Sequence, residues 1–141
     1  MNTGRGGTAS VGTTSTAALA VAGSYPQVNN VESWDGSSWT ETTEVNTARF
    51  SFQGSGSTTD GLVFGGRIIS SPPAAASALT ESWDGSSWTE VADLATARGG
   101  GGGAQNISSS TSALYFGGNT GNTNTEEWTA ADFLIKSVTT S

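Results

Sequence analysis

Short runs of apolar residues, each ending in glycine, alternate along this chain with polar stretches rich in Ser, Thr and Gly. Three of these runs cover residues 18–23, 61–66 and 113–118. No window of adequate length carries apolar residues at the 3.6-residue period of an amphipathic helix, while β-branched residues and glycine are frequent. The pattern therefore predicts an all-β protein made of short strands.

The apolar runs belong to a longer unit that occurs three times. The segment 32–41 recurs unchanged as 81–90, and a degenerate copy covers 126–133. A Thr-x-Arg element precedes each apolar run, and a polar loop of variable length follows it. Self-similarity of this kind is the signature of a repeat architecture. The chain is thus predicted to be one domain of three repeats, at about 1–46, 47–95 and 96–141.

Each repeat is predicted to form four short strands. The first is expected to begin at the Arg, the second is the apolar run, the third covers 31–34 or its equivalent, and the fourth begins at the second aromatic residue of the unit. Asp35-Gly36 and Asp84-Gly85 are turn signals between the third and fourth strands. These Asp side chains are expected to form turns rather than a calcium site, because the alternating acidic ligands of a calcium loop are absent.

This order of elements resembles the Kelch repeat: an Arg-led strand, a glycine pair closing the second strand, then a Glu with an aromatic residue, and a Trp several residues later. The resemblance covers essentially the whole chain, although the first repeat has Ala22-Gly23 for the pair. A looser resemblance links the chain to repeats of bacteriophage structural proteins. The Kelch resemblance implies that each repeat is one four-stranded blade of a β-propeller. The residues that carry it are Arg5, Arg49, Arg98, Gly23, Gly65, Gly66, Gly117, Gly118, Glu32, Glu81, Glu126, Trp34, Trp39, Trp83, Trp88, Trp128 and Phe133.

Two interpretations of these recurring side chains stay open. The Arg and Glu residues are either paired within or between blades, since a buried unpaired charge is costly, or the Arg residues line a central channel and bind an anion or a sugar. The Trp residues are either core residues that fill the space between blades or exposed platforms on which sugars stack.

Three blades do not close a ring, because propellers typically have about four to eight. The simplest closed arrangement is a homodimer with six blades. In that arrangement the first blade of one copy, led by Arg5, is expected to pack against the third blade of the other, which carries Trp128 and Phe133. The alternative is that the chain is a fragment of a longer propeller.

Composition narrows the function. The net charge is −7, and the 5 basic residues are spread thinly, which argues against nucleic-acid binding and against anionic membranes. The chain has no His and no Cys, which excludes zinc, haem and copper sites that need them, and no cofactor is expected. The sequence shows neither a signal peptide nor an apolar run long enough to span a membrane, so a soluble protein is expected.

We expect a non-enzymatic scaffold or binding module, such as a phage structural or interaction protein. A multivalent carbohydrate-binding lectin is the alternative, and a glycoside hydrolase is the third hypothesis. The loops between second and third strands, at 24–30, 67–79 and 119–124, are expected to open on one rim of the ring. Tyr25, Arg67 and Asn119 are the candidate ligand-binding residues on that rim.

Overall fold

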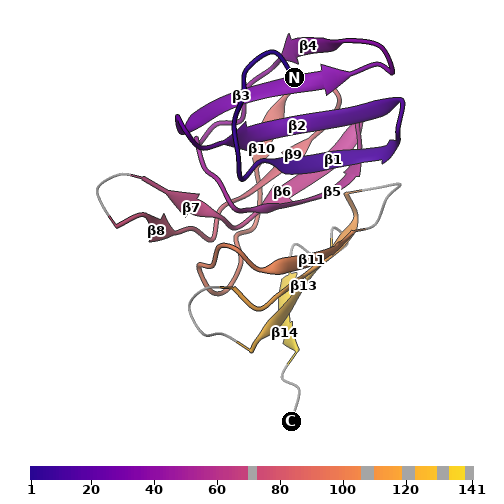
Figure 1. Cartoon of the computed structure of the whole chain (residues 1–141). Coiled ribbons are helices and arrows are strands. Elements are labelled where there is room, and N and C mark those ends of the chain that lie inside the picture. Colours follow the sequence, from indigo (N-terminus) through magenta and orange to yellow (C-terminus); the bar gives the residue numbers. More distant parts are fainter. Residues whose placement is uncertain (70–72, 106–109, 119–122, 130–133, 139–141) are drawn as a thin grey trace.

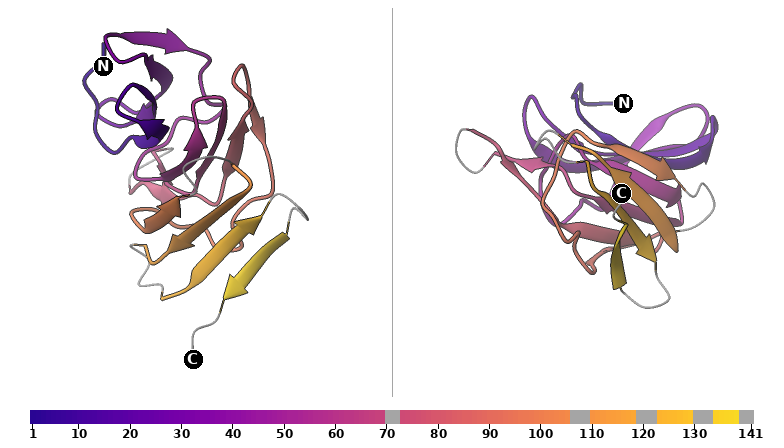
Figure 2. Two further views of the ribbon diagram at one scale, coloured as in Figure 1. Left: turned by 90° about the vertical axis from the view of Figure 1, so that its right-hand side faces the viewer. Right: turned by 90° about the horizontal axis from the view of Figure 1, so that it is seen from below.

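The computed structural model describes residues 1–69, 73–105, 110–118, 123–129 and 134–138, with the backbone alone for 105 and 134–138. Within these ranges the chain is all-β, every strand pairing is antiparallel and there is no helix. Three four-stranded sheets follow one another along the chain and lie as successive layers, with sheet 1 at the top of Figure 1 and sheet 3 at the bottom (Figures 1 and 2).

The strands of each sheet lie side by side in chain order. Sheet 1 consists of β1 (Ala9–Thr14), β2 (Ala17–Gly23), β3 (Val28–Trp34) and β4 (Trp39–Thr42). Sheet 2 consists of β5 (Gln53–Ser57), β6 (Asp60–Phe64), β9 (Thr80–Trp83) and β10 (Trp88–Glu90). Sheet 3 consists of β11 (Gly102–Gln105), β12 (Ser112–Phe116), β13 (Thr125–Thr129) and β14 (Leu134–Val138). A two-stranded hairpin, β7 (Arg67–Ile68) with β8 (Ala75–Ala76), projects from sheet 2 (Figure 1).

The first strand of each sheet begins later than the sequence predicts. It starts four residues after the Arg in all three cases, at Ala9, Gln53 and Gly102, rather than at the Arg itself. The cause is the residue two positions after each Arg, which has a positive φ: 62° at Gly7, 54° at Ser51 and 71° at Gly100. A left-handed residue interrupts the extended backbone, so the strand can form only beyond it.

Two further expectations need correction. The segment 67–79, predicted as a loop, contains the β7–β8 hairpin. The third strand of sheet 1 begins at Val28, inside the segment that was predicted as the loop 24–30.

The core consists of two apolar clusters, one on each side of sheet 2. The cluster between sheets 1 and 2 contains Ala9, Val11, Leu19, Val21, Ala22, Val31, Val45, Phe52, Val63, Trp83 and Trp88. The cluster between sheets 2 and 3 contains Leu62, Phe64, Leu94, Ala113, Tyr115 and Trp128. Alternate residues of β6 point to opposite sides, so sheet 2 is covered on both faces.

The first strands of the three sheets pack closely on one another, β1 against β5 and β5 against β11. Gly54 of β5 shows how tight this is, because a Cβ there would lie 2.4 Å from the Ser10 carbonyl oxygen. The lack of a side chain at Gly54 therefore allows the backbones of sheets 1 and 2 to approach each other.

Candidate interaction surface

The recurring Arg and Glu residues form one ion pair in each repeat. Nη1 of Arg5 lies 2.8 Å from Oε1 of Glu32. Nη1 of Arg49 lies 3.2 Å from Oε1 of Glu81, a charge contact without hydrogen-bond geometry. In the third repeat the Arg98 Nη2 donates to Oε1 of Glu126.

The other oxygen of each Glu accepts a backbone N–H from the residue three positions before the Arg. These donors are Asn2, Asn46 and Ala95. The Asn2 and Asn46 side chains also donate to the backbone carbonyls of Trp39 and Trp88, at 3.0 and 3.2 Å. We call this arrangement of Arg, Glu and backbone N–H the clasp. It fastens the segment that enters each sheet to the third strand of that sheet, and in repeats 1 and 2 also to the fourth.

The clasps are buried, and burial acts on their charges. Desolvation lowers the pKa of Arg49, while the carboxylates of Glu81, Asp93 and Glu90 raise it in compensation. Burial alone would raise the pKa of Glu32, but the N–H groups of Asn2 and Thr3 and the Arg5 guanidinium bring it below the ordinary value. Both residues are thus stabilised as ions by their partners.

The guanidinium groups do not face an open channel. The side chains of Arg5, Arg49 and Arg98 have no exposed surface. Arg49 and Arg98 also lie over aromatic rings, 5.2 Å from the centre of Phe52 and 5.7 Å from that of Tyr115. Of the two interpretations left open by the sequence, this geometry favours pairing, and an anion or a sugar would have no access to these cations.

The glycine positions close the second strand of each sheet. Gly23, Gly65, Gly66, Gly117 and Gly118 all have positive φ. Gly23 and Gly66 donate their N–H groups to the carbonyls of Arg49 and Arg98, at 3.0 and 2.8 Å. These bonds link the end of one sheet's second strand to the start of the next repeat.

The Trp residues of the identical segments 32–41 and 81–90 differ in burial. Trp83, Trp88 and Trp128 are buried, which confirms the core interpretation for these three. Trp34 and Trp39 are partly exposed and thus less buried than Trp83 and Trp88. Each pair packs ring on ring, with centroids 5.4 Å apart for Trp34–Trp39 and 5.0 Å for Trp83–Trp88. Phe133, predicted at the equivalent position of repeat 3, lies outside the described residues.

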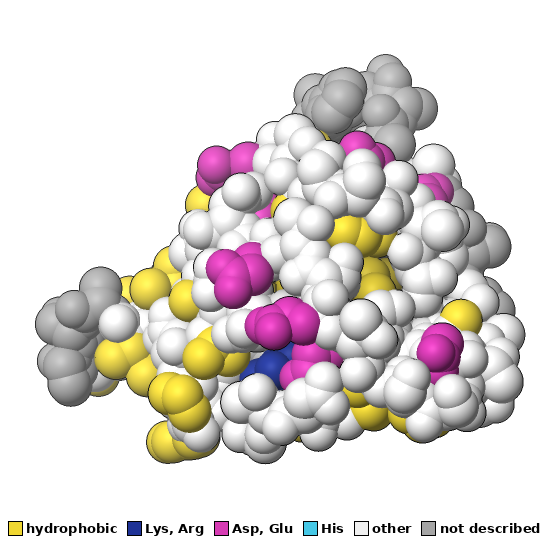
Figure 3. All heavy atoms as spheres, turned by 90° about the horizontal axis from the view of Figure 1, so that it is seen from above, with side chains coloured by type: hydrophobic (Ala, Val, Ile, Leu, Met, Phe, Trp, Pro, Cys, Tyr) yellow, Lys and Arg dark blue, Asp and Glu magenta, His cyan; other side chains and the backbone are white. Residues whose placement is uncertain are grey.

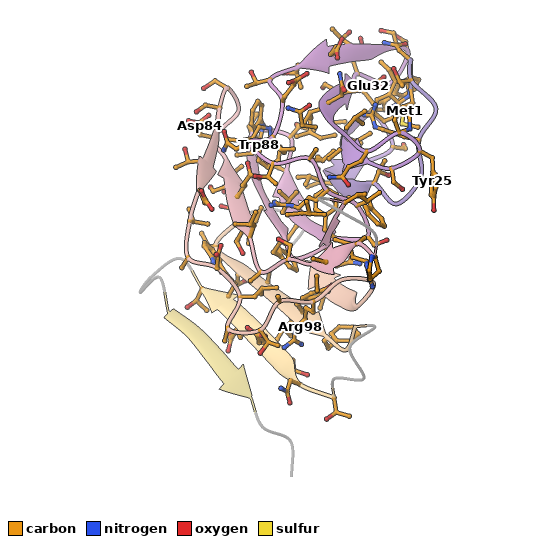
Figure 4. All side chains as sticks on the ribbon, turned by 90° about the vertical axis from the view of Figure 1, so that its left-hand side faces the viewer. Met1, Tyr25, Glu32, Asp84, Trp88 and Arg98 are labelled. Carbon is orange, nitrogen blue, oxygen red and sulfur yellow. The ribbon has the colours of Figure 1, made fainter. Side chains whose placement is uncertain are left out.

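Asp35 and Asp84 form the turns that their sequence predicts. Oδ1 of Asp35 accepts the backbone N–H groups of Ser37 and Ser38, each at 2.8 Å, and Asp84 does the same with Ser86 and Ser87. Figure 4 shows the Asp84 turn next to Trp88. These backbone hydrogen bonds lower the pKa of Asp35 to about 2 and lower that of Asp84 as well.

The turns should therefore make stability depend on pH. Because the folded-state pKa of Asp35 is depressed, its contribution is fully present above the unfolded value near 3.8 and is lost as the pH falls through about 2. We expect the Tm advantage of the wild type over Asp35→Asn to be constant above about pH 5 and to shrink between about pH 4 and pH 2. Thermal melts across this range test it, with exposed Glu44→Gln as the control. An advantage that grows on acidification would contradict the assignment.

The candidate rim residues lie on two adjoining loops. Tyr25 is 86% exposed and points away from the sheets (Figure 4). Arg67 begins the β7–β8 hairpin and donates to the Ala74 carbonyl at 2.7 Å. Gln27 joins the two loops, since it accepts the Ile69 N–H at 2.7 Å and donates to the Ala48 carbonyl. Asn119 lies outside the described residues.

Backbone hydrogen bonds run from sheet to sheet through the three left-handed residues. The Ser51 N–H donates to the Gly7 carbonyl, and the Gly100 N–H donates to the Ser51 carbonyl, both at 2.8 Å. A second link is made by Trp88, whose indole N–H donates to the Thr43 carbonyl at the end of sheet 1, at 3.1 Å. The two backbone bonds join equivalent positions of consecutive repeats, since Gly7, Ser51 and Gly100 each stand two residues after the recurring Arg.

The two outermost sheet faces differ in exposure. On sheet 3, Leu114 and Phe116 are 36% and 46% exposed. On sheet 1, Trp34 and Trp39 are partly exposed beside the buried Ala20. Figure 3, which views the molecule from the side of sheet 1, shows apolar side chains among the polar ones, with acidic groups around them and little basic surface. Trp128 of sheet 3 packs against sheet 2 and does not lie on the open face.

Searches for metal sites and membrane spans over the described ranges gave none. No group of three or more His, Cys, Asp or Glu there is arranged to hold a metal ion. No helix long and apolar enough to cross a membrane occurs in the same ranges.

Comparisons with known proteins bear on the fold alone. Neither a scan of protein-family models nor a search of curated proteins gives a match. Among solved structures, the chain is similar to one described as "Structure of YjhT", with a TM-score of 0.74 and 17% sequence identity. The similarity covers 96% of this chain and 46% of that chain. The chain therefore shares its fold with a longer protein and spans about half of that protein's length.

Proposed function

We propose that the chain is a non-enzymatic β-propeller module whose three sheets are Kelch-like blades, and that two copies close a six-bladed ring that serves as a scaffold or binding module. The observation that carries the proposal is the repetition of the contact between sheets. The same positions bury the same kinds of side chain between sheets 1 and 2 and between sheets 2 and 3. A stack of sheets that repeats one contact has to end in open faces or close on itself.

The structural comparison supports a half ring. The chain matches 46% of a longer chain over nearly its whole length, which is the relation expected if that chain holds about twice as many sheets. A homodimer would supply the same number from two copies. Leu114 and Phe116, side by side and exposed on the outer face of sheet 3, support an interface there, because neighbouring exposed apolar side chains often mark a contact surface.

The use of the charged residues supports a binding role over catalysis. The three recurring Arg and the three recurring Glu stabilise the sheets in buried pairs, and Asp35 and Asp84 are engaged in turns. Catalytic acids and bases need to reach a substrate with a suitably tuned pKa. The clasp residues are buried, and the exposed Asp35 and Asp84 carboxylates have a lowered pKa because they accept the turn hydrogen bonds.

Molar mass in solution tests the proposal. Multi-angle light scattering at micromolar concentration should give twice the protomer mass, and the Tm should rise with protein concentration because folding is coupled to assembly. A stable monomer with a concentration-independent Tm would contradict the ring. A trimer would contradict the count of six blades.

A further inference from the structure

Each of the two contacts between neighbouring sheets is made by two packed surfaces, which we call its halves, and the same two halves occur in both contacts. One half is the alternate pair of residues on the second strand: Leu19 and Val21 of β2 toward sheet 2, and Leu62 and Phe64 of β6 toward sheet 3. The other half is the opposite face of the next sheet. On sheet 2 it comprises Val63, Trp83 and Trp88, and on sheet 3 it comprises Ala113, Tyr115 and Trp128.

Each half occurs once more, without its counterpart. Leu114 and Phe116 stand where Leu62 and Phe64 stand in sheet 2, yet they are 36% and 46% exposed against 0% and 1%. Ala20, Trp34 and Trp39 stand where Val63, Trp83 and Trp88 stand; the two Trp residues are partly exposed where their equivalents are buried, while Ala20 is 8% exposed. One copy of each half therefore has no partner within the chain. One lies on the outer face of sheet 1 and the other on the outer face of sheet 3.

The backbone hydrogen bonds between sheets also leave unused groups on the two outermost sheets. Among the described residues, the Gly7 N–H has no acceptor and the Gly100 carbonyl has no donor, although the equivalent groups at Ser51 are both used. Likewise, the indole N–H of Trp39 has no acceptor there, whereas that of Trp88 donates across to Thr43. The free donors lie at the sheet 1 end and the free acceptor at the sheet 3 end.

We propose that a second copy of this chain docks head to tail on the first, with Leu114 and Phe116 of one copy packed against Ala20, Trp34 and Trp39 of the other, and with the Gly7 N–H donating to the Gly100 carbonyl across the joint. The occupant is a second copy because the joint continues, side chain by side chain, a contact that the chain makes twice within itself. The inference rests on the proposed ring and adds which faces meet, in which register and with which polarity.

The joint is heterologous, so a two-fold ring contains it twice. This separates it from a back-to-back dimer in which two copies of one face meet. Glu127 lies opposite Leu114 in the β12–β13 register, where sheet 2 has Ser82 opposite Leu62. The outer face of sheet 3 therefore carries a Glu where sheet 2 carries a Ser, and the β13–β14 register places Lys136 opposite that Glu.

The test is complementation between two variants, each damaged on one face. Phe116→Glu damages the sheet 3 face, and Trp39→Lys damages the sheet 1 face. Each variant alone should associate at least about 30-fold more weakly than the wild type. Mixed in equal amounts, they should form a heterodimer, because one joint is intact and the other places the new Glu beside the new Lys. Ile69→Glu, at an apolar residue of similar exposure on the β7–β8 hairpin, is the matched control and should dimerise normally.

Other outcomes are distinguishable. If the wild type is a dimer but Trp39→Lys also dimerises alone, the head-to-tail joint is wrong while the oligomer stands. If the wild type is a monomer, the ring itself fails. Should Trp39→Lys not fold, judged by the emission of the buried Trp83 and Trp88, Trp39→Gln takes its place. A mixture of two folded monomeric variants that shows no heterodimer would overturn the proposal.

Discussion

Replacing Trp88 with Ala is expected to lower the free energy of unfolding by about 3–5 kcal/mol. The indole is 6% exposed, packs on Trp83 and lies in the cluster between sheets 1 and 2. Its removal leaves a cavity that two sheets would have to collapse to fill, and it also breaks the hydrogen bond to Thr43 that joins them.

Urea unfolding followed by circular dichroism measures this loss. Ile69→Ala is the control, since Ile69 is an exposed apolar residue outside both clusters, and it should change stability by less than about 0.5 kcal/mol. A loss of less than about 1 kcal/mol for Trp88→Ala would mean that this position is not part of a packed core.

Removing the charge of Glu81 should lower the free energy of unfolding by a similar amount. Glu81→Gln would leave the fully buried Arg49 without its ion-pair partner, and breaking a buried pair in this way typically costs about 3–5 kcal/mol. Gln has a single acceptor oxygen, so it cannot face Arg49 with one oxygen and accept from the Asn46 backbone and side chain with the other, as Glu81 does. We expect a cooperative but strongly destabilised protein in the same unfolding experiment.

The double variant separates the charge from the packing. Replacing Arg49 with Met together with Glu81→Gln removes both ions, so a substantial part of the lost stability should return. Exposed Glu41→Gln, at the position of sheet 1 that pairs with Glu32, is the control and should be nearly neutral. Equal effects of Glu81→Gln and Glu41→Gln would show that the clasp does not stabilise the fold.

Much of the architecture could be predicted from the repeated segment. The identical stretches 32–41 and 81–90 each carry a turn signal between two aromatic residues, and both fold as a hairpin with Asp at the turn. The apolar runs become second strands because alternate residues find a sheet on either side. Local chemistry fixes these elements, so the sequence suffices to place them.

The clasps could be predicted only in part. The Arg and Glu residues are apparent from their recurrence. The Asn three residues before Arg5 and Arg49 has a weaker signal, the Asn-Thr-x-Arg motif that stands in both places. The left-handed residues could not be predicted at Ser51, because Ser has no intrinsic preference for positive φ and takes it here through hydrogen bonds to Gly7 and Gly100.

Which sheet faces remain open depends on the packing of neighbouring sheets, which no local sequence pattern contains. Trp34 and Trp83 stand in identical decapeptides, yet one is half-exposed and the other buried. These Trp residues are buried where a neighbouring sheet covers them, whatever the residue type or the strand that carries it. Which of Leu114 or Tyr115 meets sheet 2 likewise depends on the side from which that sheet packs, and this is decided by tertiary contacts.

A crystal structure of the wild-type protein, grown from the oligomeric form, tests the central claim most directly. The account predicts six four-stranded sheets around one two-fold axis, with Phe116 of each copy against Trp34 and Trp39 of the other and the Gly7 N–H on the partner's Gly100 carbonyl. Copies that meet through like faces, or an assembly in which Leu114 and Phe116 remain open to solvent, would contradict it.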